Sequence, residues 1–326
     1  MRCNTRTLNT IGGKMKILPE LKNYSEYFPP EHEFDGDGVF FNYIGANSML
    51  IRDRKSSIMI DPYFSRPGRI VGLRYFVKKI EPNPTAVADA LKKLGVEKID
   101  AIMLTHTHAD HALDAPEVAK QTSATLYGSH SAMLIGKGGG MPNDKLFEVA
   151  DKTRIDIGDF RITFYESVHL PFPRVARPIL NSKTEIDDPL EPPVRIAEYR
   201  EGGWFKMLIE HPCGTLHISS SGIDSNPAVI KADAVAITIG GLGLRTEKYR
   251  ELLFEKSILI PQAKTIYMTH WDKMANPLDQ KPEFLGRTHM VVNHFIEMAS
   301  RHKDLSIYLP IPWQTLRLFP PKETRK

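Results

Sequence analysis

One short stretch, residues 99–111, constrains what this chain can fold into more than any other. Its sequence is Ile-Asp-Ala-Ile-Met-Leu-Thr-His-Thr-His-Ala-Asp-His, an apolar strand-like run that ends in three histidines and an aspartate. Side chains at the end of a strand converge above the edge of the sheet, and imidazole with carboxylate is a ligand set that borderline metals such as zinc prefer. A helical pattern follows at 115–121, so we expect a metal site on a strand-to-helix turn, where function is common. A solvated histidine-rich loop is the alternative, but a quarter of the chain's 12 histidines lie here beside a carboxylate.

The spacing of these polar residues is highly specific. The pattern His-x-His-x-Asp-His resembles the metal-binding signature of the metallo-β-lactamase superfamily, with every ligand position matched. The resemblance implies an α/β (α+β) fold, a four-layer αββα sandwich with one or two metal ions at its edge. It also implies a ligand set with three residues on each ion and one residue between them: His106, His108 and His169 on the first, Asp110, His111 and His270 on the second, and Asp224 as the bridge.

The last three of these ligands lie downstream of the motif, each at the end of a strand-like run. His169 ends the first such run, where the superfamily places its third histidine. Asp224 follows a strand and a glycine, but the family often has Gly-Asp, so the intervening Ile223 leaves the register open. Residues 265–272 repeat the order of the first motif, an apolar strand followed by Thr-His, which makes His270 the expected last ligand.

Other residues are candidates for supporting roles around the metal ions. Asp61 follows a buried strand and is placed to hydrogen-bond the ligand loop, although an aspartate before proline is also a common turn residue. Asp272 is expected behind the ligands and Trp271 in the wall of the pocket. His130 is a further candidate for that wall, with an ordinary loop histidine as the favoured alternative.

The chain reads as one domain with a loosely patterned start. We expect residues 1–34 to form an N-terminal extension, with Met15 as an alternative start, and residues 35–326 to form the hydrolase-like domain. Within it, residues 170–203 are rich in proline, which excludes regular helix or central strand, and read as a flap over the site. Arg174 in this flap is a candidate contact for an anionic substrate group, with a solvated arginine as the alternative.

Hydrophobic periodicity and turn residues predict the regular elements. Segments 128–131 and 136–140 read as loops. Strands are expected at 39–44, 48–51, 57–60, 124–127, 161–168, 204–211, 216–221, 232–241, 265–269 and 305–309, and helices at 84–95, 115–121, 246–256 and 288–301.

Composition excludes several classes of protein. The chain of 326 residues is 41% hydrophobic and 25% charged, which is ordinary for a globular enzyme, and its net charge of +4 does not indicate a nucleic-acid binder. Two cysteines, Cys3 and Cys213, provide neither a disulfide framework nor a thiolate metal site. No apolar run is long enough to span a membrane and the first 20 residues lack a secretory pattern, so we expect a cytoplasmic protein. A homo-oligomer is left open.

The resemblance also carries an expectation about chemistry. Two zinc ions would activate a shared water for hydrolysis, with Asp110 as the catalytic residue that orients it. His108 stands where flavin-linked di-iron members usually have glutamate, which favours zinc, while manganese or iron remain alternatives. The layout resembles the ascorbate-6-phosphate lactonase-like and phospholipase D-like branches, so the expected substrate is an anionic small molecule with an ester, lactone or phosphodiester bond. The alternatives are a nuclease of the tRNA-processing type, a mono-iron persulfide dioxygenase, or a non-catalytic metal-binding protein.

Overall fold

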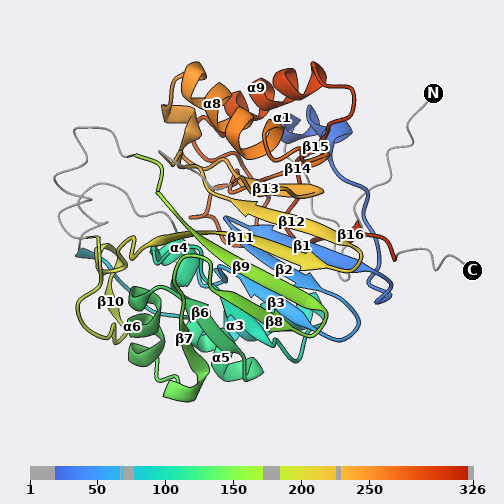
Figure 1. Cartoon of the computed structure of the whole chain (residues 1–326). Helices are drawn as coiled ribbons and strands as arrows, with labels where there is room; N and C mark the ends of the chain where they lie inside the picture. The colour runs from blue at the N-terminus through green and yellow to red at the C-terminus, as the bar shows by residue number, and fades with distance from the viewer. Residues whose placement is uncertain (1–18, 67, 69–76, 172–183, 225–228, 322–326) are drawn as a thin grey trace, which may run out of the picture.

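Two seven-stranded sheets face each other and helices cover both outer faces (Figure 1). The computed structural model describes residues 19–66, 68, 77–171, 184–224 and 229–321. In the order helix, sheet, sheet, helix, its layers form the αββα sandwich, and this expectation is confirmed.

The first sheet joins the N-terminal half of the chain to its last strand. Strands β1, β2, β3 and β16 are antiparallel, and β3, β5, β6 and β7 are parallel. In spatial order the strands are β16 (Gln314–Phe319), β1 (Val39–Gly45), β2 (Ser48–Arg52), β3 (Ser57–Ile60), β5 (Ala101–Met103), β6 (Thr125–Gly128) and β7 (Leu146–Glu148).

The second sheet is built from the C-terminal half. Strands β8, β9, β11 and β12 are antiparallel, and β12, β13, β14 and β15 are parallel. The spatial order is β15 (Ser306–Tyr308), β14 (Thr265–Thr269), β13 (Ala234–Thr238), β12 (Gly214–Ser219), β11 (Trp204–His211), β9 (Phe160–Ser167) and β8 (Arg154–Ile157). Because the carboxyl ends of parallel strands meet at one edge of a sheet, both halves deliver their strand-end side chains to the same edge of the sandwich.

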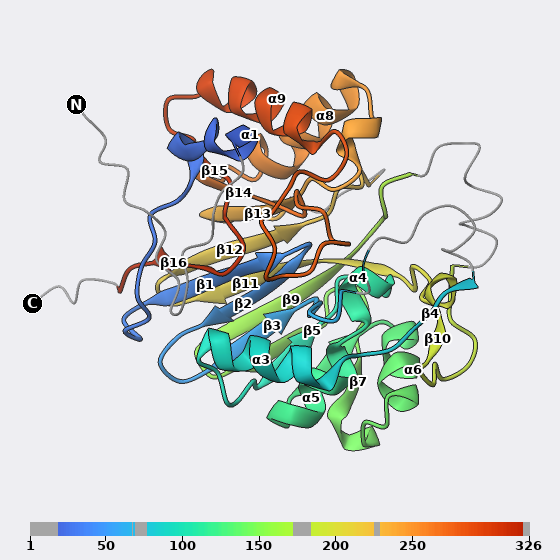
Figure 2. The same cartoon turned by 180° about the vertical axis from the view of Figure 1, so that it is seen from behind.

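Each sheet is buried on both faces, and alternation along a strand decides which core a side chain joins. In β2, Met49 and Ile51 enter the core between the sheets, whereas Leu50 between them packs under the helices of the outer face. Those helices are α3 (Pro84–Leu94), α5 (Ala115–Thr122) and α6 (His130–Gly138) (Figure 2). The opposite face carries α1 (Pro19–Lys22), α8 (Glu247–Phe254) with a π-helical turn, η5 (Glu255–Leu259), and α9 (Thr288–Ser300).

The predicted helix at 84–95 illustrates how local signals set an element. The side chain of Asn83 caps α3 by accepting hydrogen bonds from the amides of Thr85 and Ala86. Gly95 ends the helix in the left-handed region, at φ +64°. The predicted helices at 115–121, 246–256 and 288–301 are likewise confirmed, with shifted ends.

The prediction of loops at 128–131 and 136–140 is wrong, because both segments contribute to α6. The hydroxyl of Ser129 caps this helix through the amide of Ala132. Gly136 lies inside the helix, where a Cβ would approach the Leu146 side chain to 2.4 Å. The glycine therefore permits close packing on the sheet, a tertiary requirement that its sequence neighbours do not reveal.

Two segments outside the regular layers also pack on the sandwich. Residues 19–34 are held by backbone hydrogen bonds from Leu309 to Tyr27 and from His32 to Thr315, and Leu21 is buried in the core. The described part of the predicted flap, from residue 184 on, includes β10 (Val194–Arg195), which pairs with β4 (Lys79–Ile80). Among the described residues, no helix combines the length and apolar character needed to cross a membrane.

Candidate metal centre

Two groups of potential metal ligands adjoin at the edge where the parallel strands end. In each group three ligand atoms lie within 4.8 Å of one another. The rings of His106 and His111, one from each group, are 3.9 Å apart between centroids. The structure thus brings together six of the seven residues for which the sequence predicts ligation: His106, His108 and His169 in the first group, and Asp110, His111 and His270 in the second.

Strand ends and the short helix after β5 supply the six residues. β5 leads to His106 and His108, the short helix α4 (Ala109–Ala112) carries Asp110 and His111, β9 leads to His169, and β14 leads to His270. The backbone of His270 is left-handed, at φ +57°, which is uncommon for a residue with a side chain. Gly240 makes room for it, since a Cβ there would lie 2.7 Å from Nδ1 of His270.

Hydrogen bonds orient the rings of the first group. Nδ1 of His169 donates to the carbonyl of Leu170 at 2.8 Å, so this ring presents an unprotonated Nε2. Nδ1 of His106 lies 3.2 Å from the Thr105 hydroxyl, which already donates its own proton to a carboxylate and accepts here. Nε2 of His106 and Nδ1 of His108 are 3.0 Å apart. Two nitrogen ligands of one tetrahedral zinc ion lie about 3.3 Å apart, so this spacing fits a shared ion.

Asp61 sets the orientation of His111 in the second group. Nδ1 of His111 donates to Oδ2 of Asp61 at 2.8 Å, which leaves Nε2 facing the cluster. The carboxylate is fully buried and also accepts from the amide and hydroxyl of Thr105 and from Nδ2 of Asn47. The backbone of Asp61 is left-handed as well, at φ +44°, so a strained residue stands behind the ligand.

Asp110 is the member of the second group that solvent reaches, because its side chain is 20% exposed. Its Oδ2 lies 3.1 Å from Nε2 of His270 and 3.5 Å from Nε2 of His111. Burial would raise the pKa of Asp110, but the two imidazoles outweigh it and hold this pKa well below the ordinary value. Asp110 is therefore a carboxylate at neutral pH.

Burial lowers the pKa of the three histidines in the first group, whereas neighbouring carboxylates raise the pKa of His111 in the second group. Burial and neighbouring histidines lower the pKa of His106 well below the ordinary value. Burial lowers the pKa of His108 to about 3 and that of His169 to about 4, so these imidazoles are uncharged at neutral pH. The uncharged ring is the form of histidine that binds metals. Burial would also lower the pKa of His111, but Asp110 and Asp61 outweigh it and raise that pKa.

Trp204 is a site residue that the sequence did not reveal. Its indole stacks on His106 with ring centroids 4.6 Å apart and an angle of 16° between the planes, and it is almost completely buried. It covers one face of this ligand and keeps water from it. A tryptophan at the start of β11 gave no such signal, because the contact joins strands of different sheets.

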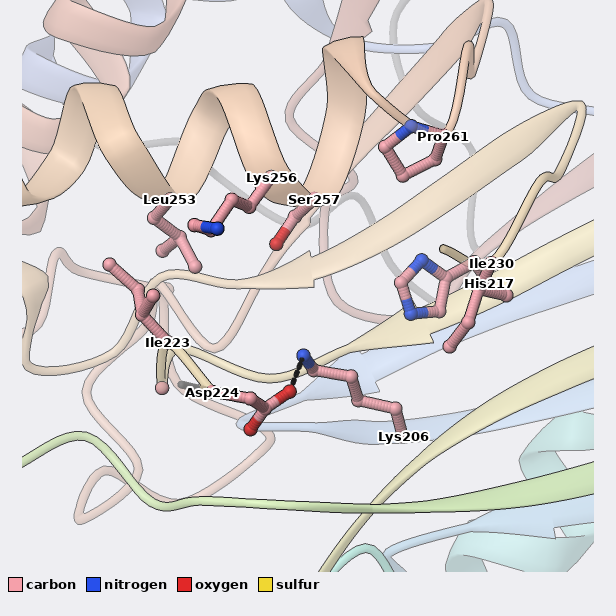
Figure 3. A pocket seen from close by; sticks show the side chains of 10 residues that line it. Lys206, His217, Ile223, Asp224, Ile230, Leu253, Lys256, Ser257 and Pro261 are labelled. Carbon is pink, nitrogen blue, oxygen red and sulfur yellow. Dashed lines mark hydrogen bonds and ion pairs between the residues drawn. The ribbon is translucent and has the colours of Figure 1, made fainter. Parts of the chain in front are cut away.

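The structure does not bring Asp224 into either group of ligands. Its Oδ2 lies 2.5 Å from Nζ of Lys206 and its Oδ1 accepts from the Ser167 hydroxyl. Figure 3 shows this ion pair in a pocket also lined by His217 and Ser257. A salt bridge thus occupies the carboxylate that the sequence placed between two metal ions.

The structure describes two of three further supporting candidates, Trp271 and His130. Trp271 is a core residue and not a pocket wall, because it is fully buried and donates Nε1 to the carbonyl of Pro310. His130 begins α6, pairs with the exposed Glu148 and is in neither ligand group, which agrees with the favoured alternative to a wall residue. Arg174 lies outside the described residues.

Asp272 contacts none of the six ligand side chains. It accepts hydrogen bonds from the Tyr43 hydroxyl, the Ala46 amide and the guanidinium of Arg66. The hydrogen bond from Ala46 therefore connects the segment after His270 to the turn between β1 and β2.

A third group with metal-ligand chemistry, Asp53, Asp159 and His211, lies apart from this edge. Nδ1 of His211 accepts from the amide of Cys213, so the proton of the neutral ring is on Nε2, which faces Asp53 at 3.4 Å. Asp159 is paired with Lys55. Hydrogen bonds and charge pairing thus satisfy this group without an ion.

The comparison with protein families agrees with the fold and the ligand edge. The sequence model of the metallo-beta-lactamase superfamily matches residues 43–280, which is most of the chain. The chain therefore belongs to the metallo-β-lactamase superfamily.

Curated relatives match over a shorter region. A UPF0173 metal-dependent hydrolase of Rhizobium meliloti is 29% identical over 128 residues, which is 39% of this chain and 46% of that protein. A UPF0173 protein of Pyrococcus furiosus is 26% identical over 127 residues, 39% of this chain and 48% of that protein. The chain thus spans about half the length of the curated relatives it matches.

Solved structures share the fold at low identity. An isothiocyanate hydrolase from Delia radicum gut bacteria has a TM-score of 0.53 at 16% identity, covering 86% of this chain and 99% of that one. A possible metal-dependent hydrolase of Veillonella parvula has a TM-score of 0.53 at 15% identity, covering 86% of this chain and 100% of that one.

Proposed function

We propose that this protein is a metal-dependent hydrolase with two metal ions, most suitably zinc, that cleaves an ester, lactone or phosphodiester bond of an anionic small molecule. The observation that carries the proposal is the pair of adjoining ligand groups at the sheet edge. Membership in the superfamily and the metal-dependent hydrolases among the relatives support it.

The residues present fit the ions chemically. Five imidazoles and one carboxylate form a donor set that suits zinc, with iron and manganese as alternatives. Nε2 of His270 faces Oδ2 of Asp110 at 3.1 Å, so these two atoms can bind the same ion, and Nδ1 of the ring has no hydrogen-bond partner among the described residues. The first group would hold one ion and the second group the other. Bound ions would supply a nucleophilic hydroxide at neutral pH and polarise the bond under attack.

The chain's own residues provide position, charge and exclusion of water. Asp61 fixes the ring of His111, and Trp204 shields His106. Asp110 stays ionised and is reached by solvent, so it can accept a hydrogen bond from an attacking water and orient it toward the substrate. In this proposal Asp224 supplies no bridge, since Lys206 neutralises it.

The test combines elemental analysis with an activity screen. Purified protein should contain two metal ions per chain and hydrolyse members of a panel of lactones and phosphodiesters such as bis-p-nitrophenyl phosphate. A chelator should abolish the activity and added zinc should restore it. Asp110→Asn should keep the fold, measured by circular dichroism, and lose at least about a hundredfold in kcat.

Two results would replace the proposed function by a rival function, and a third would refute the mechanism. Iron with oxygen uptake on a persulfide would indicate a dioxygenase, and RNA cleavage without turnover of small substrates would indicate a nuclease. Full activity in the Asp110→Asn variant would refute the mechanism.

A further inference from the structure

The turn between β1 and β2 lies where the two sheets meet at the ligand edge. Asn47 is in this turn and is completely buried. Ala46 beside it is left-handed, at φ +49°, so the turn holds a conformation that only its surroundings can stabilise.

A single amide group of Asn47 connects three strand ends. Its Nδ2 donates to Oδ2 of Asp61 at 2.7 Å, after β3 of the first sheet. Its Oδ1 accepts from the hydroxyls of Thr238 and Thr269 at 3.0 Å each, and these residues end β13 and β14 of the second sheet. The bond to Asp61 reaches the carboxylate that orients His111, and the bond to Thr269 reaches the residue before His270.

The backbone of the same turn makes a second connection to His270. The amide of His270 donates to the carbonyl of Ala46 at 2.7 Å, and the amide of Ala46 donates to Asp272 at 2.7 Å. The turn therefore holds the left-handed ligand from the residues before and after it. The same turn thus makes hydrogen bonds to both left-handed residues, His270 and Asp61, and these bonds help to stabilise their strained backbones.

The chemistry at this position requires an amide. Asp61 needs a donor, whereas the two threonine hydroxyls need an acceptor. Aspartate at position 47 would set a second carboxylate against Asp61, and alanine would leave a buried carboxylate and two hydroxyls with fewer partners.

We propose that Asn47 is a positioning residue that keeps the second ligand group, Asp110, His111 and His270, assembled across the two sheets. The inference rests on the ligand set of the proposed function. It goes beyond that set by assigning the alignment of its two halves to one side chain outside it.

A purely structural role for a buried asparagine is the competing explanation, and the chain offers a matched control. Asn42 lies in the middle of β1, is 2% exposed and donates to the hydroxyl of Thr315 at 2.6 Å. Asn42→Ala and Asn47→Ala both remove a buried amide from the same hairpin. Only the second is expected to act on the metal ions.

The experiment measures metal binding on the full chain. Wild type, Asn42→Ala, Asn47→Ala and Asn47→Asp are loaded with zinc, dialysed and analysed for metal, and stepwise zinc affinities come from competition with a chromophoric chelator. Wild type and Asn42→Ala should retain two ions. In both Asn47 variants the ion held by the second ligand group should bind at least about tenfold more weakly. The ion held by the first ligand group should be retained. Cobalt substitution should show a changed spectrum for one of the two sites only.

Each result decides between the explanations. Zinc affinities in the Asn47 variants equal to those of Asn42→Ala would overturn the role of Asn47. If Asn47→Ala does not fold, the double variant Thr238→Val, Thr269→Val replaces it; this keeps the bond to Asp61 and should still weaken the second ion, whereas unchanged affinity overturns the proposal. A wild-type chain with fewer than two ions would refute the ligand set itself, and the inference with it.

Discussion

The ion pair between Asp224 and Lys206 makes a prediction that separates a salt bridge from a metal-bridging ligand. The two side chains are 15% and 9% exposed, and their charged atoms are 2.5 Å apart. Asp224→Asn would leave the Lys206 ammonium nearly buried beside Lys256 and the uncharged His217. Breaking a fully buried pair from one side costs about 3–5 kcal/mol. Because this pair retains some exposure, we expect a loss of about 3 kcal/mol in the free energy of unfolding.

A loss of that size is measurable in a chain of this length. It corresponds to a fall in melting temperature of about 4 °C, which thermal unfolding of the metal-free protein would detect. The double variant Lys206→Met, Asp224→Asn removes both charges and should recover most of the loss. As a control, Asp156→Asn breaks an exposed pair with Arg161 and should cost less than about 1 kcal/mol.

Metal content decides the alternative. Asp224→Asn should bind as many ions as the wild type, because the carboxylate belongs to neither ligand group. Loss of an ion in this variant, together with unchanged stability of the metal-free protein, would refute the reasoning and restore Asp224 as the bridge.

Two other predictions concern buried groups. Neither ring nitrogen of His217 in β12 has a hydrogen-bond partner among the described residues. Burial together with Lys206 lowers the pKa of this ring to about 3, from 6.5 in the unfolded chain. Since the folded pKa is the lower one, the stability gained from keeping this ring uncharged is complete above pH 6.5 and declines as the pH falls. At pH 5 the loss in the free energy of unfolding is about 2 kcal/mol. Urea unfolding of His217→Phe should therefore show a correspondingly smaller drop in this free energy between pH 7 and pH 5. A drop equal to that of the wild type would contradict the lowered pKa of His217. Asp61→Ala should weaken binding of one zinc ion by about 10- to 100-fold, because His111 loses the carboxylate that orients it. Chelator competition measures this affinity. Unchanged affinity for both ions would show that the hydrogen bond between His111 and Asp61 is dispensable.

Residue types at strand ends, together with the resemblance of the His-x-His-x-Asp-His motif to the superfamily signature, selected most of the candidate site from the sequence. The apolar run before His106 and the similar run before His270 identify buried strands, and a strand's direction determines where the next side chain points. Periodicity and caps also predicted the main helices and many of the strands, because these signals act over a few residues, whereas the two-sheet architecture was implied by the resemblance to the superfamily. Spacing within the motif is likewise local, so it predicted the ligand types without knowledge of the fold.

The remaining features depend on contacts between distant segments, and only the tertiary structure decided them. Asp224 pairs with Lys206 because β11 brings a lysine beside the loop after β12, and Trp204 covers His106 because two sheets face each other. Asn47 serves both sheets through residues that are far from it in the chain. A sequence pattern indicates which side of its own strand a residue occupies. The partner that this residue contacts in another segment depends on how the separate segments pack. That packing determined the places of the Asp224 carboxylate, the Trp204 indole and the Asn47 amide.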